Sequence, residues 1–261
     1  MKSGKPNDEG TEPRSLGPEV TLAPGASGRD LEIAGRFGLR AAGERNPSGW
    51  QLLRCERGLQ LVAPADAGGW TVALDAGRGA LLRRLASVRR NDALPRAVGL
   101  PRRATLPDVV DATAGLGRDT LTLASLGCRV TAIERVPALA FLLCAALDGV
   151  PFRDRVTVVP AEASPWLRDL PAADAPAVVY LDPMFPTAGR AQVKKEMQAC
   201  RALAGAATDA GELLQAALAT ARERVVVKRH ARDPALAPGV SLAVRGERER
   251  FDVYLVSGAG G

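Results

Sequence analysis

The sequence predicts an α/β protein with a mostly parallel sheet that ends in an antiparallel hairpin, preceded by a small α+β subdomain. First, short apolar runs alternate with amphipathic segments from Leu106 onward, as in consecutive βαβ units. Second, a glycine-containing segment, residues 111–119, follows one strand-like run and opens a helix-like one. Third, two strand-like runs flank the polar turn Gly246-Glu247-Arg248 near the end of the chain.

The first part of the chain divides into a tail and a small subdomain. Residues 1–28 are rich in Gly, Pro, Ser and charge without hydrophobic periodicity, which predicts a disordered or loosely attached tail. Within residues 29–104 we expect a helix over 30–39 and three short antiparallel strands over 49–75, separated by polar turns. A connector with a basic face follows, and it carries Arg83, Arg84, Arg89, Arg90, Arg96, Arg102 and Arg103.

Residues 105–261 are predicted to form the main domain. The apolar runs predict parallel strands at 108–112, 129–133, 155–159, 177–181 and 224–228. The segments between them predict helices at 118–126, 137–147, 165–170 and over most of 191–222. The closing hairpin is expected within 240–258.

Composition excludes several classes of protein. With 46% hydrophobic and 25% charged residues, the chain is neither disordered throughout nor fibrous. The longest apolar run, residues 136–147, is shorter than the ~18 residues of a membrane span, and the N-terminus lacks the apolar core of a secretory signal. A cytoplasmic protein with no membrane partner is therefore expected. Four widely spaced cysteines and a single histidine predict reduced thiols and no metal site.

The net charge is +6 and most of the basic residues are arginines, since lysine occurs at only five positions. Arginine makes bidentate contacts with phosphate and stacks on bases, which favours a nucleic-acid partner. A compositional bias from a GC-rich genome explains the same excess, so the charge supports this partner only slightly.

The glycine segment predicts a nucleotide-type ligand. Gly115 and Gly117 allow the backbone to approach a ligand at the edge where open α/β sheets bind nucleotides. Glu134 lies 23 residues after Asp111, at the end of the next strand, where a carboxylate can accept hydrogen bonds from ribose hydroxyls. The alternative is that the two glycines only make a tight strand-to-helix turn.

Charge near this loop favours a cationic cofactor. The third position of a dinucleotide fingerprint is Thr120 instead of glycine, and a carboxylate at Asp111 would repel a pyrophosphate. Asp111 and Asp119 suit S-adenosylmethionine, which carries an ammonium and a sulfonium. Glu162, after the third strand, is placed to accept a hydrogen bond from an adenine amino group, although a solvent-exposed glutamate is the simpler interpretation.

The segment Asp182-Pro183-Met184-Phe185-Pro186 predicts chemistry on an exocyclic amine. It resembles the D/N-P-P-Y/F motif of methyltransferases that act on amino groups of bases or amides. Asp182 and the Pro183 carbonyl can accept N–H groups from the amine, and Phe185 can stack on the unstacked base. The alternative is a proline turn with a buried Phe185.

Four basic residues follow at the same predicted edge: Lys194, Lys195, Lys228 and Arg229. Such residues can bind phosphates beside a target base, which gives affinity without sequence information. For Lys194 and Lys195 a solvated helix face is an equally good explanation.

Residues 106–119, together with 180–186, 193–197, 224–229 and 251–254, closely resemble the bacterial ribosomal RNA small subunit methyltransferase J family. The resemblance implies a class I, Rossmann-like methyltransferase fold with a seven-stranded sheet. It implies methyl transfer from S-adenosylmethionine, leaving S-adenosylhomocysteine, to N2 of a guanine in 16S rRNA or the 30S subunit, at position 1516. It also implies cofactor contacts by Arg118, Asp119, Glu134, Arg135, Glu162, Ala163 and Asp182. Small hydroxyl residues are expected where this chain has Glu162 and Ala163.

Other functions stay open on the sequence alone. Methylation of another exocyclic amine, such as adenine N6, uses the same Asp182 chemistry. A non-catalytic RNA-binding assembly factor would keep the fold without the reaction. An NAD-dependent oxidoreductase would use a similar sheet edge.

Overall fold

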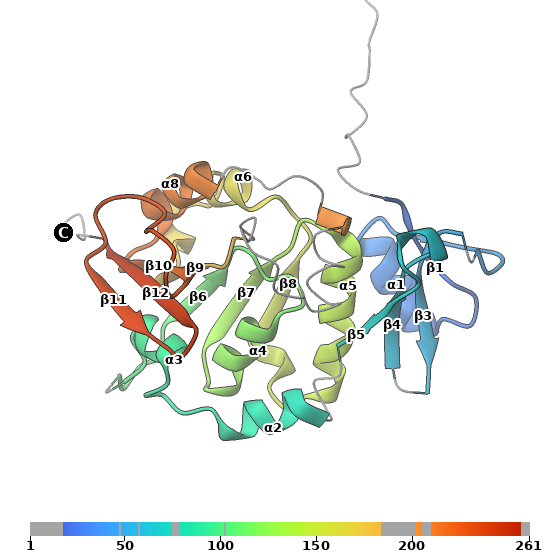
Figure 1. Cartoon of the computed structure of the whole chain (residues 1–261), viewed down its shortest axis with the longest axis horizontal. Helices are drawn as coiled ribbons and strands as arrows, with labels where there is room; N and C mark the ends of the chain where they lie inside the picture. Colours follow the sequence, from blue (N-terminus) through green and yellow to red (C-terminus); the bar gives the residue numbers. More distant parts are fainter. Residues whose placement is uncertain are drawn as a thin grey trace, which may run out of the picture.

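The structure is a computed structural model that describes residues 18–46, 48–56, 58–74, 79–101, 103–183, 202–204 and 210–256. It contains a five-stranded sheet near the start of the chain and a seven-stranded sheet that makes up the main domain (Figure 1). No described helix is long and apolar enough to cross a membrane.

The five-stranded sheet has the order β2-β1-β3-β4-β5. Its strands are β1 (Val20–Leu22), β2 (Arg40–Ala41), β3 (Trp50–Cys55), β4 (Gly58–Val62) and β5 (Thr71–Ala73). The predicted antiparallel strands correspond to β3, β4 and β5, and the predicted helix to α1 (Gly28–Arg36). A short 3-10 helix, η1 (Ala65–Ala67), lies between β4 and β5.

The boundary of the predicted tail was wrong. Residues 20–22 form β1, which lies inside the sheet and pairs in parallel with both β2 and β3. Leu22 is fully buried, and the Ala23 N–H donates to the Leu52 carbonyl at 2.9 Å. A three-residue strand has no measurable periodicity, so only its long-range pairing identifies it.

The connector forms two short helices, α2 (Gly79–Ser87) and α3 (Ala93–Ala97). Pro95 lies in the first turn of α3, where its missing N–H removes no intrahelical hydrogen bond. The helix α2 packs against α4 (Arg118–Ser125), and this contact brings the basic connector to the main domain.

The main sheet has the order β11-β12-β10-β9-β6-β7-β8. Its strands are β6 (Asp108–Asp111), β7 (Arg129–Ile133), β8 (Val156–Val159), β9 (Val178–Leu181), β10 (Arg224–His230), β11 (Leu242–Arg245) and β12 (Glu249–Leu255). Five are parallel, and β12 pairs in antiparallel fashion with β10 and β11. The predicted α/β class, parallel core and antiparallel ending are therefore confirmed.

Helices cover both faces of this sheet (Figure 1). Alternate strand residues face opposite sides: Val178 packs with α3 and α4, whereas Val179 packs with α6 (Ala163–Arg168) and α8 (Ala210–Thr220). Of the helix predicted over 191–222, α8 and residues 202–204 lie within the described residues. Besides η1, the described residues contain three short turns of 3-10 helix: η2 (Leu147–Gly149), η3 (Arg153–Arg155) and η4 (Ala172–Asp174).

The helix α5 (Pro137–Ala146) joins the two sheets into one core. It contacts β8 of the main sheet and β4 and α1 of the smaller one. Phe141 and Leu143 are fully buried. The 12-residue apolar run is thus explained by a helix most of whose residues are buried between the two sheets.

Candidate active site

The candidate site lies at the carboxyl ends of β6 and β9, which are neighbours in the middle of the main sheet. From β6 the chain adds β7 and β8 on one side, and later β9 and β10 on the other. Open α/β sheets bind ligands at the point where the strand order reverses in this way. The glycine segment and the Asp182 segment both lie at this point.

The two glycines of the loop serve different purposes. Both have left-handed backbones, with φ of +53° at Gly115 and +71° at Gly117. A Cβ on Gly117 would lie 2.2 Å from Leu143 Cδ1 of α5, whereas a Cβ on Gly115 would meet no atom within 4 Å. Gly117 therefore allows close packing of the loop against α5, whereas the described residues leave the space beside Gly115 open.

Glu134 holds the glycine loop in place. Its carboxylate accepts the Gly115 N–H at 2.7 Å and the Val136 N–H at 2.8 Å. The residue is 8% exposed, and burial raises the pKa of this carboxyl although the two N–H groups oppose the rise. We expected a ribose contact here. Each oxygen keeps one acceptor position beyond its backbone bond, so both roles fit the same carboxylate.

Asp111 lies beneath the loop. It is 1% exposed, and its carboxylate accepts the Thr120 hydroxyl at 2.5 Å and the Thr113 N–H at 3.2 Å. The expectation that Asp111 faces a cationic cofactor is therefore not supported, because its side chain is enclosed by the loop and α4. Burial raises the pKa of Asp111 to about 7.

The raised pKa of Asp111 predicts a pH-dependent stability. As the pH rises from about 4 to about 7, the unfolded carboxyl ionises freely while the folded one resists, so the wild type loses stability over this range. Asp111→Asn keeps the shape and removes the charge, because its amide can accept from Thr113 and donate to Thr120. We expect its free energy of unfolding at pH 8 to exceed that of the wild type by roughly 1–2 kcal/mol. Urea titrations at pH 5 and pH 8 measure this difference.

Asp252→Asn is the matched control for that experiment. Asp252 is 2% exposed, but its carboxylate accepts from Arg250 at 2.6 and 2.9 Å. Neutralising it leaves the guanidinium without its anion, so this variant should lose stability at both pH values. An Asp111→Asn protein with the same pH dependence as the wild type would contradict the prediction.

Asp182 follows β9 and is tied to the glycine loop. Its N–H donates to the Thr113 hydroxyl at 2.6 Å, so the two segments share one hydrogen bond. Its side chain is 41% exposed. Pro183 is the last described residue of this segment, and Phe185 lies outside the described residues.

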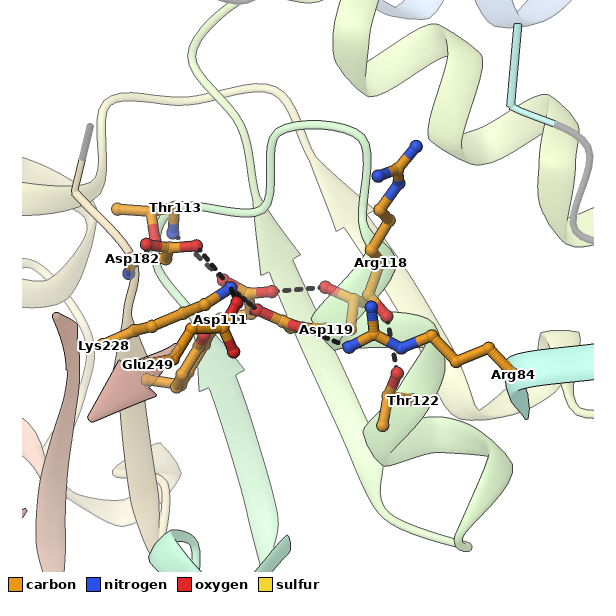
Figure 2. Close-up of polar contacts among 11 residues, drawn as sticks. Arg84, Asp111, Thr113, Arg118, Asp119, Thr122, Asp182, Lys228 and Glu249 are labelled. Carbon is orange, nitrogen blue, oxygen red and sulfur yellow. Dashed lines mark hydrogen bonds and ion pairs between the residues drawn. The ribbon is translucent and has the colours of Figure 1, made fainter. Parts of the chain in front are cut away.

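A cluster of carboxylates surrounds one lysine at this edge (Figure 2). Lys228, on β10, places its Nζ 2.8 Å from Asp119 Oδ2, 2.9 Å from Asp182 Oδ2 and 3.8 Å from Glu249 Oε1. Asp119 also accepts the Tyr180 hydroxyl at 2.6 Å. We call these four charged residues, Asp119, Asp182, Lys228 and Glu249, the Lys228 cluster.

The members of the Lys228 cluster change one another's protonation. Although the Asp182 side chain is 41% exposed, desolvation by the protein around it raises the pKa of its carboxyl to about 6; Lys228 opposes this rise and the charge of Asp119 adds to it. Burial acts on Asp119 in the same direction, but Lys228 and Tyr180 outweigh it and lower the pKa of that carboxyl. Burial disfavours the Lys228 ammonium, yet the surrounding carboxylates hold its pKa above the ordinary value. At neutral pH the cluster contains an ammonium between anions.

The predicted phosphate-binding residues are placed differently from expectation. The side chain of Lys228 is 17% exposed and bonded to carboxylates, and that of Arg229 is 7% exposed with Nε donating to the Pro234 carbonyl at 3.0 Å. Both cations therefore bind groups of this chain, and the prediction that they bind phosphate is not supported. Lys194 and Lys195 lie outside the described residues.

The remaining predicted cofactor residues lie along the same edge. Arg118 is the first residue of α4, and Figure 2 shows its side chain directed away from the Lys228 cluster. Arg135 follows β7, with its guanidinium 3.7 Å from the carboxylate of Glu162 after β8. Ala163, the first residue of α6, is buried. All these positions therefore lie at one edge of the sheet, where the carboxyl ends of β6, β7, β8 and β9 meet.

Sequence reasoning did not identify Thr113, Tyr180, Glu249 or Arg84 as parts of the site. The Arg84 guanidinium of α2 lies 3.7 Å from Asp119 Oδ1 (Figure 2). The only signal for it was the basic connector, which carried no indication of where it packs. The edge therefore presents the exposed carboxylate of Asp182 and, among the described residues, an open space beside the Gly115 backbone.

Comparisons with known proteins show which family the chain is similar to. The family model described as "Putative SAM-dependent methyltransferase" matches residues 32–256. The ribosomal RNA small subunit methyltransferase J of Thioalkalivibrio sulfidiphilus is 42% identical over 85% of this chain and 91% of its own. The ribosomal RNA small subunit methyltransferase J of Dechloromonas aromatica is 37% identical, and the match covers 89% of this chain and 97% of that protein.

A solved structure shows the same fold over nearly the whole chain. The crystal structure of a SAM-dependent methyltransferase from Neisseria gonorrhoeae is 30% identical, with a TM-score of 0.70, covering 93% of this chain and 97% of that one. The relatives therefore match both sheets and not the main domain alone. The chain belongs to the ribosomal RNA small subunit methyltransferase J family of SAM-dependent methyltransferases.

Proposed function

We propose that this protein transfers a methyl group from S-adenosylmethionine to the exocyclic N2 amine of a guanine in 16S rRNA. The observation that carries the proposal is Asp182, whose carboxylate is held beside the glycine loop through the 2.6 Å bond from its N–H to Thr113. The names of the relatives support a small-subunit rRNA substrate. The guanine, its N2 atom and position 1516 rest on the family resemblance of the sequence.

The cofactor would be held along the edge already described. S-adenosylmethionine, when bound, supplies an electrophilic methyl group on a sulfonium. Asp182 would offer its exposed carboxylate to a cationic group of the cofactor, and Asp119, which already binds Lys228 and Tyr180, would act on that group through its charge. Glu134 would offer its remaining acceptor positions to the ribose. Four further positions complete the proposed cofactor site: Arg118, Arg135, Glu162 and Ala163.

Asp182 and Pro183 would prepare the amine. The lone pair of an exocyclic amine is delocalised into the base, so the amine is a poor nucleophile. An N–H donated to the Asp182 carboxylate, and a second to the Pro183 carbonyl, would orient the lone pair toward the methyl group. The methylated nitrogen would then give one proton to Asp182, leaving a neutral secondary amine. A carboxyl with a pKa of about 6 accepts that proton at neutral pH.

Residues outside the described range complete the proposal. Phe185 would stack on the target base, which must be unstacked or single-stranded to reach Asp182. Lys194 and Lys195 would bind phosphates of the RNA backbone. Their contribution to affinity would weaken as salt is added.

The test is transfer of labelled methyl from S-adenosylmethionine to naked 16S rRNA and to 30S subunits, both from cells that lack this protein. Mapping the label should find it on N2 of one guanine, with transfer by Asp182→Ala slower by about 10²-fold or more. Label on an adenine or on another RNA would reject the guanine of 16S rRNA as the target and identify the labelled nucleotide in its place. Cofactor binding without transfer to either substrate would reject the rRNA assignment, and preference for NAD in calorimetric titration would reject methyl transfer.

A further inference from the structure

Lys228 occupies an unusual place for a lysine. It lies on β10, between β9 and β12, opposite Phe251 in the antiparallel register. Its side chain is 17% exposed, and carboxylates from three separate elements converge on its ammonium. They come from the first turn of α4, the end of β9 and the start of β12.

The two short ion pairs connect the two halves of the proposed site. Asp119 belongs to the helix that opens after the glycine loop, and Asp182 belongs to the proposed amine-binding segment. Lys228 Nζ lies 2.8 Å from one and 2.9 Å from the other, so a single ammonium fixes both carboxylates (Figure 2). Without it, two neighbouring anions would repel each other and move apart or take up protons.

One oxygen of Asp182 is left for another partner. Lys228 donates to Oδ2, and within the described ranges no residue donates to Oδ1. The 41% exposure of the side chain gives that oxygen access to a ligand. An acceptor held at one oxygen and open at the other is suited to receive an N–H in a defined direction.

We propose that Lys228 is a positioning residue, which holds the Asp182 carboxylate as an ionised, aimed acceptor and couples it to Asp119 at the cofactor end of the site. This inference rests on the proposed function for the role of Asp182, but the ion pairs themselves do not depend on it. Lys228 is not expected to contact the substrate, since its ammonium is bonded to the two carboxylates.

The charges around Lys228 support this assignment. Charged and titratable groups from every element packed around the Lys228 cluster face Lys228 or one of its ion-pair partners. They are Arg84, Asp111, Asp119, Tyr180, Asp182 and Glu249. Most of these groups are acidic, and they disfavour ionisation of Asp182. The Lys228 ammonium is the cation in direct contact with that carboxylate. Removing it should therefore raise the pKa of Asp182 above about 6.

The experiment compares wild type, Lys228→Met and Lys228→Arg in the full chain. The pKa of the Asp182 carboxyl is measured by ¹³C NMR on aspartate-labelled protein, with Asp182→Asn to assign its signal. Methyl transfer to 16S rRNA is measured from pH 5 to pH 9 in parallel. Arg222→Met is the matched control, because it removes a 3.0 Å ion pair to Asp108 at the opposite end of the sheet.

We expect Lys228→Met to raise the pKa of Asp182 by about one to three units. The acid limb of the plot of rate against pH should move to higher pH by the same amount. At pH 7 the rate should fall by about twofold for a rise of one unit and by about a hundredfold for a rise of three units, since less of Asp182 is ionised. Lys228→Arg should restore the limb to near its wild-type position, and Arg222→Met should not move it. If Lys228→Met does not fold, Lys228→Gln provides the same uncharged comparison.

Three outcomes decide between the claims. An unchanged pKa of Asp182 in a folded Lys228→Met protein overturns the proposal, even if the rate falls. A raised pKa with an unmoved rate profile also overturns it, because Asp182 would then not limit the reaction. If the pKa of Asp182 rises in Lys228→Met but the wild-type protein methylates no rRNA, the electrostatic role of Lys228 is supported and the proposed function is rejected.

Discussion

Asp182→Ala is expected to lower kcat for methyl transfer by about 10²–10⁴-fold. The substitution removes the acceptor that orients the amine and the base that takes its proton. The fold should survive, because the Asp182 side chain is 41% exposed and Lys228 keeps Asp119 as a partner at 2.8 Å. Single-turnover assays on the rRNA substrate, with far-ultraviolet circular dichroism as the fold check, measure the loss.

Two further variants show which property of Asp182 matters. Asp182→Asn keeps one acceptor oxygen but loses the charge, so its rate should lie between those of the wild type and Asp182→Ala. Asp108→Ala removes a half-exposed aspartate at the far end of β6 and should leave the rate within about twofold of the wild type. Full activity in Asp182→Ala would remove Asp182 from the chemistry and favour the non-catalytic assembly factor.

Most of the main domain could be predicted from the sequence because its strands are apolar on both faces. Residues 129–133 were predicted as a strand and form β7 with the same bounds. The smaller sheet was predicted only where its strands are consecutive hairpins. Its β1 and β2 are three and two residues long, and β1 lies between β2 and β3 through parallel pairing that no local pattern encodes.

The site was predictable in position but less so in its contacts. Glu134 lies at the carboxyl end of β7, as its spacing from the glycine segment predicts, and Asp182 lies at the carboxyl end of β9, as the apolar run before it predicts. The enclosure of Asp111 depends on its hydrogen bond from Thr120. In the sequence, Thr120 was noted only because it replaces the third glycine of a dinucleotide-binding fingerprint. Lys228 appeared as a basic residue at a strand end. Its direction depends on Asp119 and Glu249, 109 residues before it and 21 after it in the chain.

The two glycines of the loop should respond differently to the same substitution. Gly117→Ala should lower the free energy of unfolding by roughly 2–5 kcal/mol, since it adds the strain of a left-handed backbone to overpacking against Leu143. The Cβ would lie 2.2 Å from Leu143 Cδ1, and Leu143 is fully buried within α5. Urea unfolding measures the loss.

Gly115→Ala is the matched comparison, two residues away on the same loop. Its φ of +53° carries the left-handed strain of about 1–2 kcal/mol, but its Cβ meets no atom within 4 Å. The added methyl would instead fill the space proposed for the cofactor, so affinity for S-adenosylmethionine should fall at least about tenfold in a protein that remains folded. Calorimetric titration and urea unfolding of both variants therefore separate the effect on binding from the effect on packing. A Gly115→Ala protein with wild-type affinity for the cofactor would place the ligand elsewhere along the edge. A Gly117→Ala protein as stable as the wild type would show that α5 can move away from the loop.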